Sequence, residues 1–427
     1  MFNKNTFIVG FMLFAMFFGA GNLIFPPKLG LQSGSEFIFA ISGFILTGVG
    51  LPLLAVIISA YYTNGYQEAL NRINPLFSTL FLMAIYLSLG PFFAIPRTAA
   101  TAYEMAILPS LDAPTDLIRL AFSLVYFALA LWLALSPSKM VSRIGAVLTP
   151  ILLCAILALV LRAFFLFEDK TLHITTMPEE GSAFFKGFLE GYFTMDALAA
   201  IIFSVIVIAA IKAKGIAGEH LTKQVILSGL VAAIALSLVY VSLAWIGNKV
   251  TLSPEVLASL SENKQDIGTF ILNSVAHQAF GKAGQVVLAV IVSLACLTTA
   301  VGLIVSVSQY FHQLYPRLAY KHYALVFTLI GLVIANQGLN EVIKGSVPVL
   351  LILYPIVITV ILVLLTHLFV KVPLMAQRLS VGLVTIVSIL SVLNLEFMQA
   401  LPLKAYSMEW LPFALVGLGL GWLRKDN

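Results

Sequence analysis

Charged side chains are scarce in this sequence. Lys, Arg, Asp and Glu make up 10% of the 427 residues, whereas hydrophobic residues make up 60% and the mean hydropathy is +1.03. A soluble domain carries about 25% charged residues, so this surface could not be solvated on all sides. The scarcity argues against a large soluble enzyme and indicates an integral membrane protein.

Other absences narrow the function. The two cysteines, Cys154 and Cys296, lie inside apolar runs, so neither a disulfide framework nor a cysteine metal site is expected. No GxxxxGK[ST] phosphate loop is present, which argues against an ATP-driven pump. The net charge of +5 is spread over short loops, which argues against nucleic-acid binding. No His/Asp/Glu cluster marks one membrane face, so we expect no enzyme, no catalytic residues and no obligatory protein partner.

Long apolar runs are abundant. A bilayer core needs roughly 20 apolar residues per helix, and runs such as 37–60 and 347–365 reach or approach that length. The pattern predicts an all-α membrane protein with about 12 transmembrane helices, at residues 6–29, 37–61, 76–105, 117–135, 141–165, 183–211, 225–247, 268–311, 323–335, 342–368, 379–395 and 408–423. The eighth run is too long for one span, so we expect residues 268–278 to form an external helix.

The loops suggest an orientation and a single domain. The longest, at residues 168–182 and 248–267, are expected to be connectors, so the whole chain, 1–427, is predicted to form one transmembrane domain. Alternate loops carry most of the basic residues, among them Arg72, Arg317 and Lys371. Most carboxylates fall in the other loops. Because basic loops stay in the cytoplasm, both termini are predicted to be cytoplasmic.

Two of the predicted spans contain helix-disrupting residues. The first carries Gly19, Gly21 and Asn22 inside its apolar run, and the sixth carries Gly191, Thr194 and Asp196. Unwound backbone is tolerated in a membrane only where it lines a cavity or is buried in protein. Half-helix ends then offer N–H groups to an anion and carbonyl oxygens to a small cation. Breaks five spans apart are what an inverted pair of five-helix repeats would produce.

Asp196 is the most informative single residue. A carboxylate at mid-membrane costs about 2.5–3.5 kcal/mol even on the lenient insertion scale, so intramembrane acids are functional candidates. Glycines in membrane helices, by contrast, often serve close helix packing alone. A structural partner for Asp196 is the competing interpretation.

Two motifs resemble those of a known family. Residues 10–27 (GFMLFAMFFGAGNLIFPP) look like the first helix of the bacterial branched-chain amino acid:cation symporters, the BrnQ-type carriers, and residues 90–104 (GPFFAIPRTAATAYE) look like their third helix. The resemblance extends over essentially the whole chain in length and span count. It implies the leucine-transporter fold: repeat one at about 6–167, repeat two at about 183–368, and two extra helices at about 379–423.

The resemblance implies a sodium site. In that fold, two carbonyls at the break in helix one join a carbonyl and two hydroxyls of helix eight, spaced A-x-x-[T/S]-[T/S]. Here the matching ligands are Ala15, Phe18, Ala295, Thr298 and Thr299. Such hard oxygen ligands suit a hard ion. Hydroxyls that bond back to their own helix are the alternative interpretation of the two threonines.

The resemblance also implies a substrate site. The carboxylate of an amino acid would meet the N–H groups of Ala20 and Gly21, near Asn22, and its ammonium would meet the carbonyls of Phe193 and Thr194. Phe92, Phe193 and Met195 are the candidate walls for an aliphatic side chain.

Asp196 departs from the pattern of the better-known sodium:amino acid carriers, which usually have a small or hydroxylated residue there. It would hold the ammonium, bind a second cation with Asn22 and Thr194, or carry a proton. Arg97 and Glu104 are expected to be gate or pairing residues, with a structural role favoured for Glu104.

The predicted function is therefore sodium-coupled symport of leucine, isoleucine and valine into the cell by alternating access, in the bacterial cytoplasmic (inner) membrane. Sodium is expected as the coupling ion, with no other cofactor. The alternatives are a proton-coupled amino acid carrier that uses Asp196 and a membrane enzyme or sensor that transports nothing.

Overall fold

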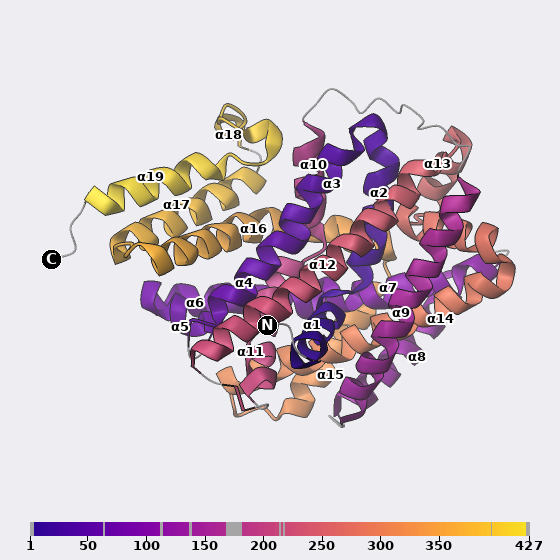
Figure 1. Ribbon diagram of the computed structural model, residues 1–427, viewed down its shortest axis with the longest axis horizontal. Coiled ribbons are helices and arrows are strands. Elements are labelled where there is room, and N and C mark those ends of the chain that lie inside the picture. Colours follow the sequence, from indigo (N-terminus) through magenta and orange to yellow (C-terminus); the bar gives the residue numbers. More distant parts are fainter. Residues whose placement is uncertain are drawn as a thin grey trace.

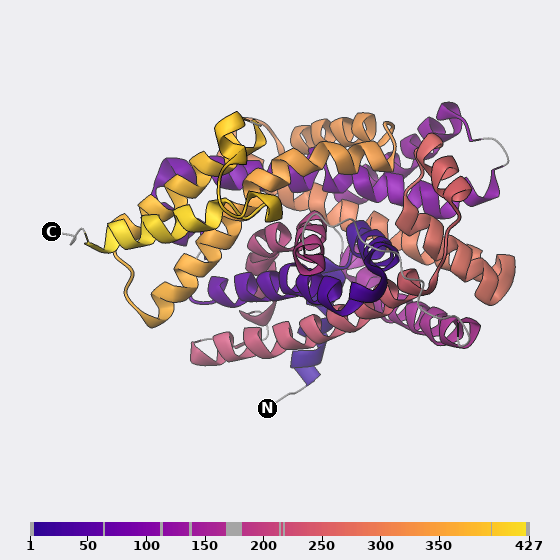
Figure 2. The same cartoon turned by 90° about the horizontal axis from the view of Figure 1, so that it is seen from above.

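The chain folds into helices that run across and around one another (Figures 1 and 2). The computed structural model describes residues 4–62, 65–111, 114–135, 139–167, 182–212, 215–216, 218–393 and 395–423, with the backbone alone at 139–149 and 219. Helices, and no strand, occur in these residues. This confirms the all-α prediction. The predicted connector at 168–182 falls outside the described residues apart from its last position.

The first half of the chain contributes α1 to α9. In chain order these are α1 (Lys4–Phe17), α2 (Ala20–Ser33), α3 (Phe37–Ile45), α4 (Leu51–Ser59), α5 (Gly65–Ile73), α6 (Pro75–Leu87), α7 (Ala94–Ala106), α8 (Asp116–Leu135) and α9 (Lys139–Leu166). Short 3-10 or π turns join several of them: η1 (Gly34–Glu36), η2 (Leu46–Gly50), η3 (Ser88–Phe92) and η4 (Leu108–Ser110).

The second half contributes α10 to α19. These are α10 (Ala183–Phe193), α11 (Asp196–Lys212), α12 (Glu219–Lys249), α13 (Pro254–Glu262), α14 (Ile267–Leu314), α15 (Tyr320–Ala335), α16 (Leu339–Phe369), α17 (Leu374–Val392), α18 (Glu396–Gln399) and α19 (Trp410–Leu423), with η5 at Lys404–Tyr406. The predicted connector at 248–267 thus contains a helix, α13. Helices α17 and α19 pack together at one end of the molecule (Figure 1).

Several helices have the length and composition of membrane spans. Seven helical stretches of the described part pass that test, or eight when the bent pair α10–α11 is taken as one span. Four shorter apolar helices accompany them, at 4–17, 150–166, 320–335 and 410–423. The membrane class is therefore confirmed, while the total of twelve spans stays a prediction.

The predicted breaks in the first and sixth spans are present. α1 ends at Phe17 and α2 begins at Ala20, and α10 meets α11 at an angle of 45°. Met195 lies in the second break with φ +69°, the left-handed region that costs a non-glycine residue roughly 1–2 kcal/mol. A strained, buried methionine at this point is a feature that the glycine pattern did not predict.

Two further interruptions differ from the simple span pattern. The third span is divided by η3, where Gly90 leaves helical geometry before Pro91; an added Cβ at Gly90 would lie 2.9 Å from Val307 on α14. The long α14 is divided at Gly281, whose φ is +64°. Its first part, predicted to be an external helix, is packed into the protein, because Gly268 lies against the Ile24 backbone of α2.

Glycines let several pairs of helices cross at backbone contact, among them α3–α10 and α2–α12. An added Cβ at Gly187 of α10 would lie 1.8 Å from the Ala40 carbonyl oxygen of α3, and one at Gly43 would lie 2.0 Å from the Phe184 oxygen. The α2–α12 crossing is similar, because a Cβ at Gly30 would lie 1.8 Å from the Ala244 oxygen. Small residues permit such close packing of membrane helices. We call these contacts the glycine crossings.

We expect Gly187→Ala to destabilise the protein, because the added methyl group must push α3 and α10 apart. Overpacking of this kind costs about 1–3 kcal/mol or more, so the melting temperature in detergent should fall by several degrees. Gly382→Ala on α17 is the matched control, since nothing lies within 4 Å of its Cβ position. Equal melting curves for the two variants would contradict the crossing.

Candidate functional site

A small cavity of about 40 Å³ lies between the two helix breaks. We call it the central cavity. Six predicted substrate-site residues line it: Ala20, Gly21, Asn22, Thr194, Met195 and Asp196. They are joined by residues that the sequence did not single out for the site, among them Leu89, Ala199, Phe203 and Leu303. This volume is far below the roughly 300–1,000 Å³ of a typical ligand pocket, so the cavity is too small for an amino acid in this conformation.

Asp196 is the centre of a buried hydrogen-bond network. The residue is 2% exposed and begins α11, so its carboxylate lies at a helix N-terminus, where negative charge is favoured. Its Oδ2 accepts hydrogen bonds from Asn22 Nδ2, at 2.6 Å, and from the Tyr240 hydroxyl, at 2.9 Å. The Asn22 amide also donates to that hydroxyl. This network joins α2, α11 and α12 beside the central cavity.

Tyr240 is a site residue that the sequence did not reveal. It lies on α12, fully buried, and its ring packs edge-on against Phe44 at a centroid distance of 5.3 Å. A lone tyrosine in an apolar helix carries no motif, and its carboxylate partner is 44 residues away in the chain.

Arg97 of α7 also reaches the central cavity. The side chain is 2% exposed, and its Nη1 donates to the Phe193 carbonyl oxygen at 2.6 Å, at the end of α10. Its Nη2 donates to Ser346 of α16 at 3.3 Å. The guanidinium carbon lies 5.3 Å from the centre of the Phe25 ring. One side chain therefore links α2, α7, α10 and α16 around the site.

The first break frees backbone oxygens. Gly19 N donates to Asn22 Oδ1 at 2.9 Å instead of to the carbonyl one turn back, which is that of Ala15. Phe18 lies between the last residue of α1 and the first of α2, so its carbonyl precedes the α2 ladder. Both predicted carbonyls are thus placed where the helical bonding is interrupted.

Thr299 of α14 lies beside this break. It lines the central cavity together with Gly19, and an added Cβ at Gly19 would lie 3.6 Å from its methyl group. Thr298 and Ala295 belong to the same helix, but they do not line the central cavity. The Thr298 hydroxyl donates to the Ala295 carbonyl at 2.9 Å, which is the back-bonding that the alternative interpretation describes.

The two candidate phenylalanines differ in position. Phe193 does not line the central cavity, but its carbonyl oxygen accepts a hydrogen bond from Arg97, which does, and its ring lies 6.1 Å from that of Phe25. Phe92 is 40% exposed and lies outside the lining of the central cavity. The reason is the η3 interruption, which turns the chain by Gly90 and directs residue 92 away from the site.

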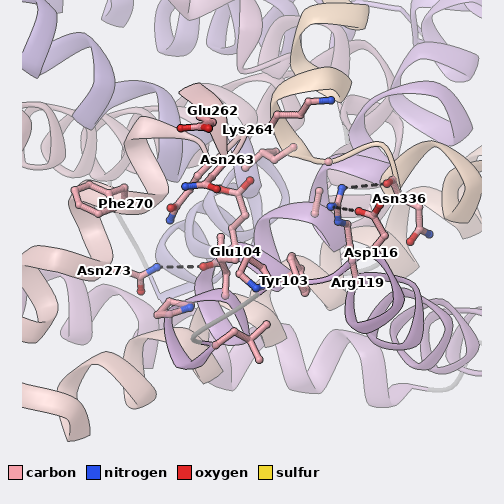
Figure 3. A pocket seen from close by; sticks show the side chains of 18 of the residues that line it. Tyr103, Glu104, Asp116, Arg119, Glu262, Asn263, Lys264, Phe270, Asn273 and Asn336 are labelled. Carbon is pink, nitrogen blue, oxygen red and sulfur yellow. Dashed lines mark hydrogen bonds and ion pairs between the residues drawn. The ribbon is translucent and has the colours of Figure 1, made fainter. Parts of the chain in front are cut away.

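Two larger cavities flank the central one. The first, about 1160 Å³, lies beside the C-terminal end of α7 and the start of α8 (Figure 3), and we call it the α8 cavity. The second, about 790 Å³, involves α5, α6, α11 and α14, and we call it the α5 cavity. Along the third span the α8 cavity uses residues after Arg97, and the α5 cavity uses residues before Leu89. The central cavity therefore lies between them.

Polar contacts close the α8 side. Glu104, 5% exposed, accepts hydrogen bonds from the Asp266 N–H at 3.1 Å and the Thr269 hydroxyl at 2.6 Å, which ties α7 to the start of α14. This is the kind of structural contact that was expected for Glu104. Lys28 and Glu190, 3.3 Å apart, join α2 to α10.

Aromatic side chains close the α5 side. Tyr86 and Tyr310 line the α5 cavity, and their rings are stacked with centroids 3.9 Å apart. Phe203, on the central-cavity side, packs against Phe17 with centroids 6.2 Å apart. The site is therefore separated from both flanking cavities. Such an arrangement suits the binding and release of a small solute and requires no covalent chemistry.

Comparison with known proteins identifies the family. The family model described as "Branched-chain amino acid transport protein" matches residues 2–427. A protein of Staphylococcus saprophyticus that bears the name "Putative branched-chain amino acid carrier protein" is 50% identical over 430 residues, covering 99% of this chain and 96% of that protein. One from Staphylococcus aureus (strain MRSA252) is 48% identical over 431 residues, with coverages of 99% and 96%.

Solved structures share the fold at low sequence identity. MhsT in complex with L-phenylalanine is 15% identical with a TM-score of 0.58, covering 97% of this chain and 98% of that one. The inward-facing conformation of Mhp1 is 13% identical with a TM-score of 0.60, covering 97% and 90%. These neighbours have the leucine-transporter fold, as expected from the sequence. The chain thus belongs to the branched-chain amino acid transport protein family, a family of multi-pass membrane transporters and not of enzymes.

Proposed function

We propose that this protein carries leucine, isoleucine and valine into the cell together with sodium, by alternating access, in the bacterial cytoplasmic membrane. The observation that carries the proposal is the meeting of both helix breaks at one small cavity. There, the start of α2 and the end of α10 present backbone N–H and carbonyl groups beside Asp196. With both termini in the cytoplasm, the α8 cavity faces outwards and the α5 cavity faces inwards.

The helix ends match the two charges of an amino acid. The substrate carboxylate meets the N–H groups of Ala20 and Gly21 in the first turn of α2, where the helix dipole favours an anion. The ammonium meets the carbonyls of Phe193 and Thr194, at the negative end of α10. The carboxylate of Asp196 adds a negative charge within the same cavity.

Apolar residues of the central cavity suit a branched side chain. Met195, Ala199, Phe203 and Leu303 line it. Because one methylene group changes binding in an apolar pocket by only about 1–3 kcal/mol, all three branched amino acids are accepted. The cavity must widen to admit any of them.

Sodium binding at the first break supplies the driving force. Its ligands are the carbonyls of Ala15, Phe18 and Ala295 and the hydroxyls of Thr298 and Thr299, with Thr298 and Ala295 drawn toward the break when the ion binds. Sodium entry down 100 mV yields about 2.3 kcal/mol, and a tenfold gradient adds about 1.4 kcal/mol. One sodium ion per substrate then permits accumulation on the order of several hundred-fold.

Leucine uptake into proteoliposomes tests the proposal. Purified protein should accumulate radiolabelled leucine when sodium is high outside, and choline in place of sodium at constant pH should abolish accumulation. We expect Thr299→Ala to raise the sodium concentration for half-maximal uptake by at least tenfold, because one oxygen ligand is lost. Unchanged sodium dependence in this variant would remove the assignment of α14 to the ion site.

A second candidate is proton coupling through Asp196, which the buried carboxylate and its hydrogen-bond network favour. Accumulation driven by an inward proton gradient in sodium-free buffer would support it and would refute sodium coupling. Loss of all accumulation in choline would exclude it. A protein that accumulates no aliphatic amino acid under either gradient would refute both.

A further inference from the structure

We propose that Arg97 pairs with the α-carboxylate of the substrate, and that its guanidinium occupies the ammonium subsite at the Phe193 carbonyl while the carrier is empty. The inference rests on the proposed function, which places an amino acid in the central cavity. It adds that the guanidinium of Arg97 leaves the Phe193 carbonyl and pairs with the substrate carboxylate when the substrate enters.

The first argument is charge. Arg97 is 2% exposed, yet none of the ion pairs among the described residues includes it. A buried charge is expensive unless it is paired with an opposite charge and hydrogen-bonded. Its Nε has no hydrogen-bond partner at all in the described part of the chain. The guanidinium therefore has unused donors beside a cavity, where an anion would satisfy them.

The second argument is position. Arg97 lines the central cavity, and an added Cβ on Gly21 would lie 3.1 Å from Arg97 Nη1. The guanidinium thus adjoins the first turn of α2, where the substrate carboxylate is expected. Arginine presents a planar fork that matches both oxygens of a carboxylate. Together, the helix N–H groups and Arg97 form a receptor for a planar anion.

The third argument is the bond that Arg97 makes now. Nη1 donates to the Phe193 carbonyl oxygen at 2.6 Å, the oxygen assigned to the substrate ammonium. The guanidinium and the substrate ammonium are both positively charged N–H donors, so they compete for this carbonyl oxygen. When the substrate binds, its ammonium takes the carbonyl and its carboxylate takes the guanidinium. The exchange loses no charge-assisted hydrogen bond and gives the buried arginine a counter-ion.

The bound class follows from this exchange. Zwitterionic α-amino acids satisfy both subsites, whereas analogues without the carboxylate leave Arg97 competing with their ammonium. The discriminating probes are leucine, leucinamide (a neutral amide in place of the carboxylate) and 3-methylbutylamine. For a buried charge pair, loss of one partner weakens binding by about 2–5 kcal/mol, so leucinamide should bind on the order of 100-fold more weakly than leucine.

Ligand-dependent thermal stabilisation of the purified protein, in sodium buffer, measures binding and folding together. The readout is the ratio of the half-stabilising concentrations of leucinamide and leucine. We expect a ratio on the order of 100 for the wild type and below 10 for Arg97→Gln, mainly because leucine binds more weakly. Arg97→Lys keeps the positive charge but lacks the planar guanidinium fork, so its ratio should lie between those of the wild type and Arg97→Gln. Arg119→Gln, on α8 at the α8 cavity, should keep the wild-type ratio.

A ratio near one in the wild type would overturn the proposal without any variant, and so would a ratio near 100 in Arg97→Gln. If Arg97→Gln does not fold, the ratios of the wild type and of Arg97→Lys still test the proposal. Failure of the proposed function looks different, because the wild type would then not respond to leucine, isoleucine or valine. Another stabilising α-amino acid and its amide would then test Arg97 in the same way. If no α-amino acid stabilises the protein, both proposals are wrong.

Discussion

Replacing Asp196 by alanine is expected to lower leucine uptake by at least 100-fold. The substitution removes the acceptor of the Asn22 amide and the Tyr240 hydroxyl, which donate to Oδ2 at 2.6 and 2.9 Å. Each buried donor left without a partner costs about 1–3 kcal/mol. The negative charge beside the ammonium subsite disappears as well. The measurement is initial uptake by proteoliposomes, normalised to the amount of reconstituted protein.

The variant Asp196→Asn removes the negative charge of this side chain but keeps its shape, so it tests the charge alone. Its Oδ1 can still accept from Asn22 and Tyr240, so the fold should survive while uptake remains at least 100-fold reduced. Glu255→Ala on the exposed face of α13 is the control and should transport like the wild type. Wild-type uptake by Asp196→Asn would show that the charge has no part in transport.

The kinetics of Asp196→Asn also distinguish the three roles considered for this carboxylate. If Asp196 holds the ammonium, the KM for leucine rises while the sodium dependence is unchanged. If it binds a second cation, the steepness of the sodium dependence falls. If it carries a proton, exchange of internal for external leucine persists, but accumulation driven by a pH gradient is lost.

Replacing Gly21 by alanine is expected to lower leucine uptake to a similar extent. Here the cause is the volume of the added methyl group and not the loss of a charge. The added methyl group would lie 3.1 Å from Arg97 Nη1 and 3.3 Å from Phe25 and from the Thr194 backbone. It enters a cavity of about 40 Å³ at the point where the substrate carboxylate is expected. Leucine uptake should fall by at least 100-fold, as the carboxylate can no longer approach the first turn of α2.

The protein itself should remain stable in this variant, because alanine favours the helix by about 1 kcal/mol over glycine. Gly419→Ala on α19 is the matched control, since nothing lies within 4 Å of its Cβ position. Should Gly21→Ala transport leucine with an unchanged KM, the carboxylate does not bind at this helix end.

Local features of the sequence were sufficient to predict the two helix breaks. Gly19 and Gly21 weaken the first span, and Asp196 has an unavoidable energetic cost in the sixth, so both signals lie within a few residues of the break. The third interruption was missed, although Gly90–Pro91 is visible in the sequence. At this interruption Gly90 lies close to Val307, more than 200 residues away, and no local pattern contains that contact.

The remainder of the site could not be predicted for the same reason. Tyr240 approaches Asp196 only because α12 crosses beside α11, and Phe203 and Leu303 reach the cavity from different helices. The family resemblance implies a wall role for Phe92, but the resemblance does not contain the η3 interruption that precedes this residue. For a side chain in an intact, apolar helix, the local sequence does not show which other helix it will contact.

The glycine crossings also determine where this molecule can bend. At these crossings α2 touches α12, and α10 touches α3, with so little space that a slide of either partner forces backbone atoms into collision. Each pair must therefore move as a rigid block. The hinges lie instead at Phe18–Gly19 and at Thr194–Met195, where the hydrogen-bond ladders already stop. Bending the chain at these joints breaks fewer helical hydrogen bonds than bending an intact helix, so the two broken spans offer the least elastic resistance there.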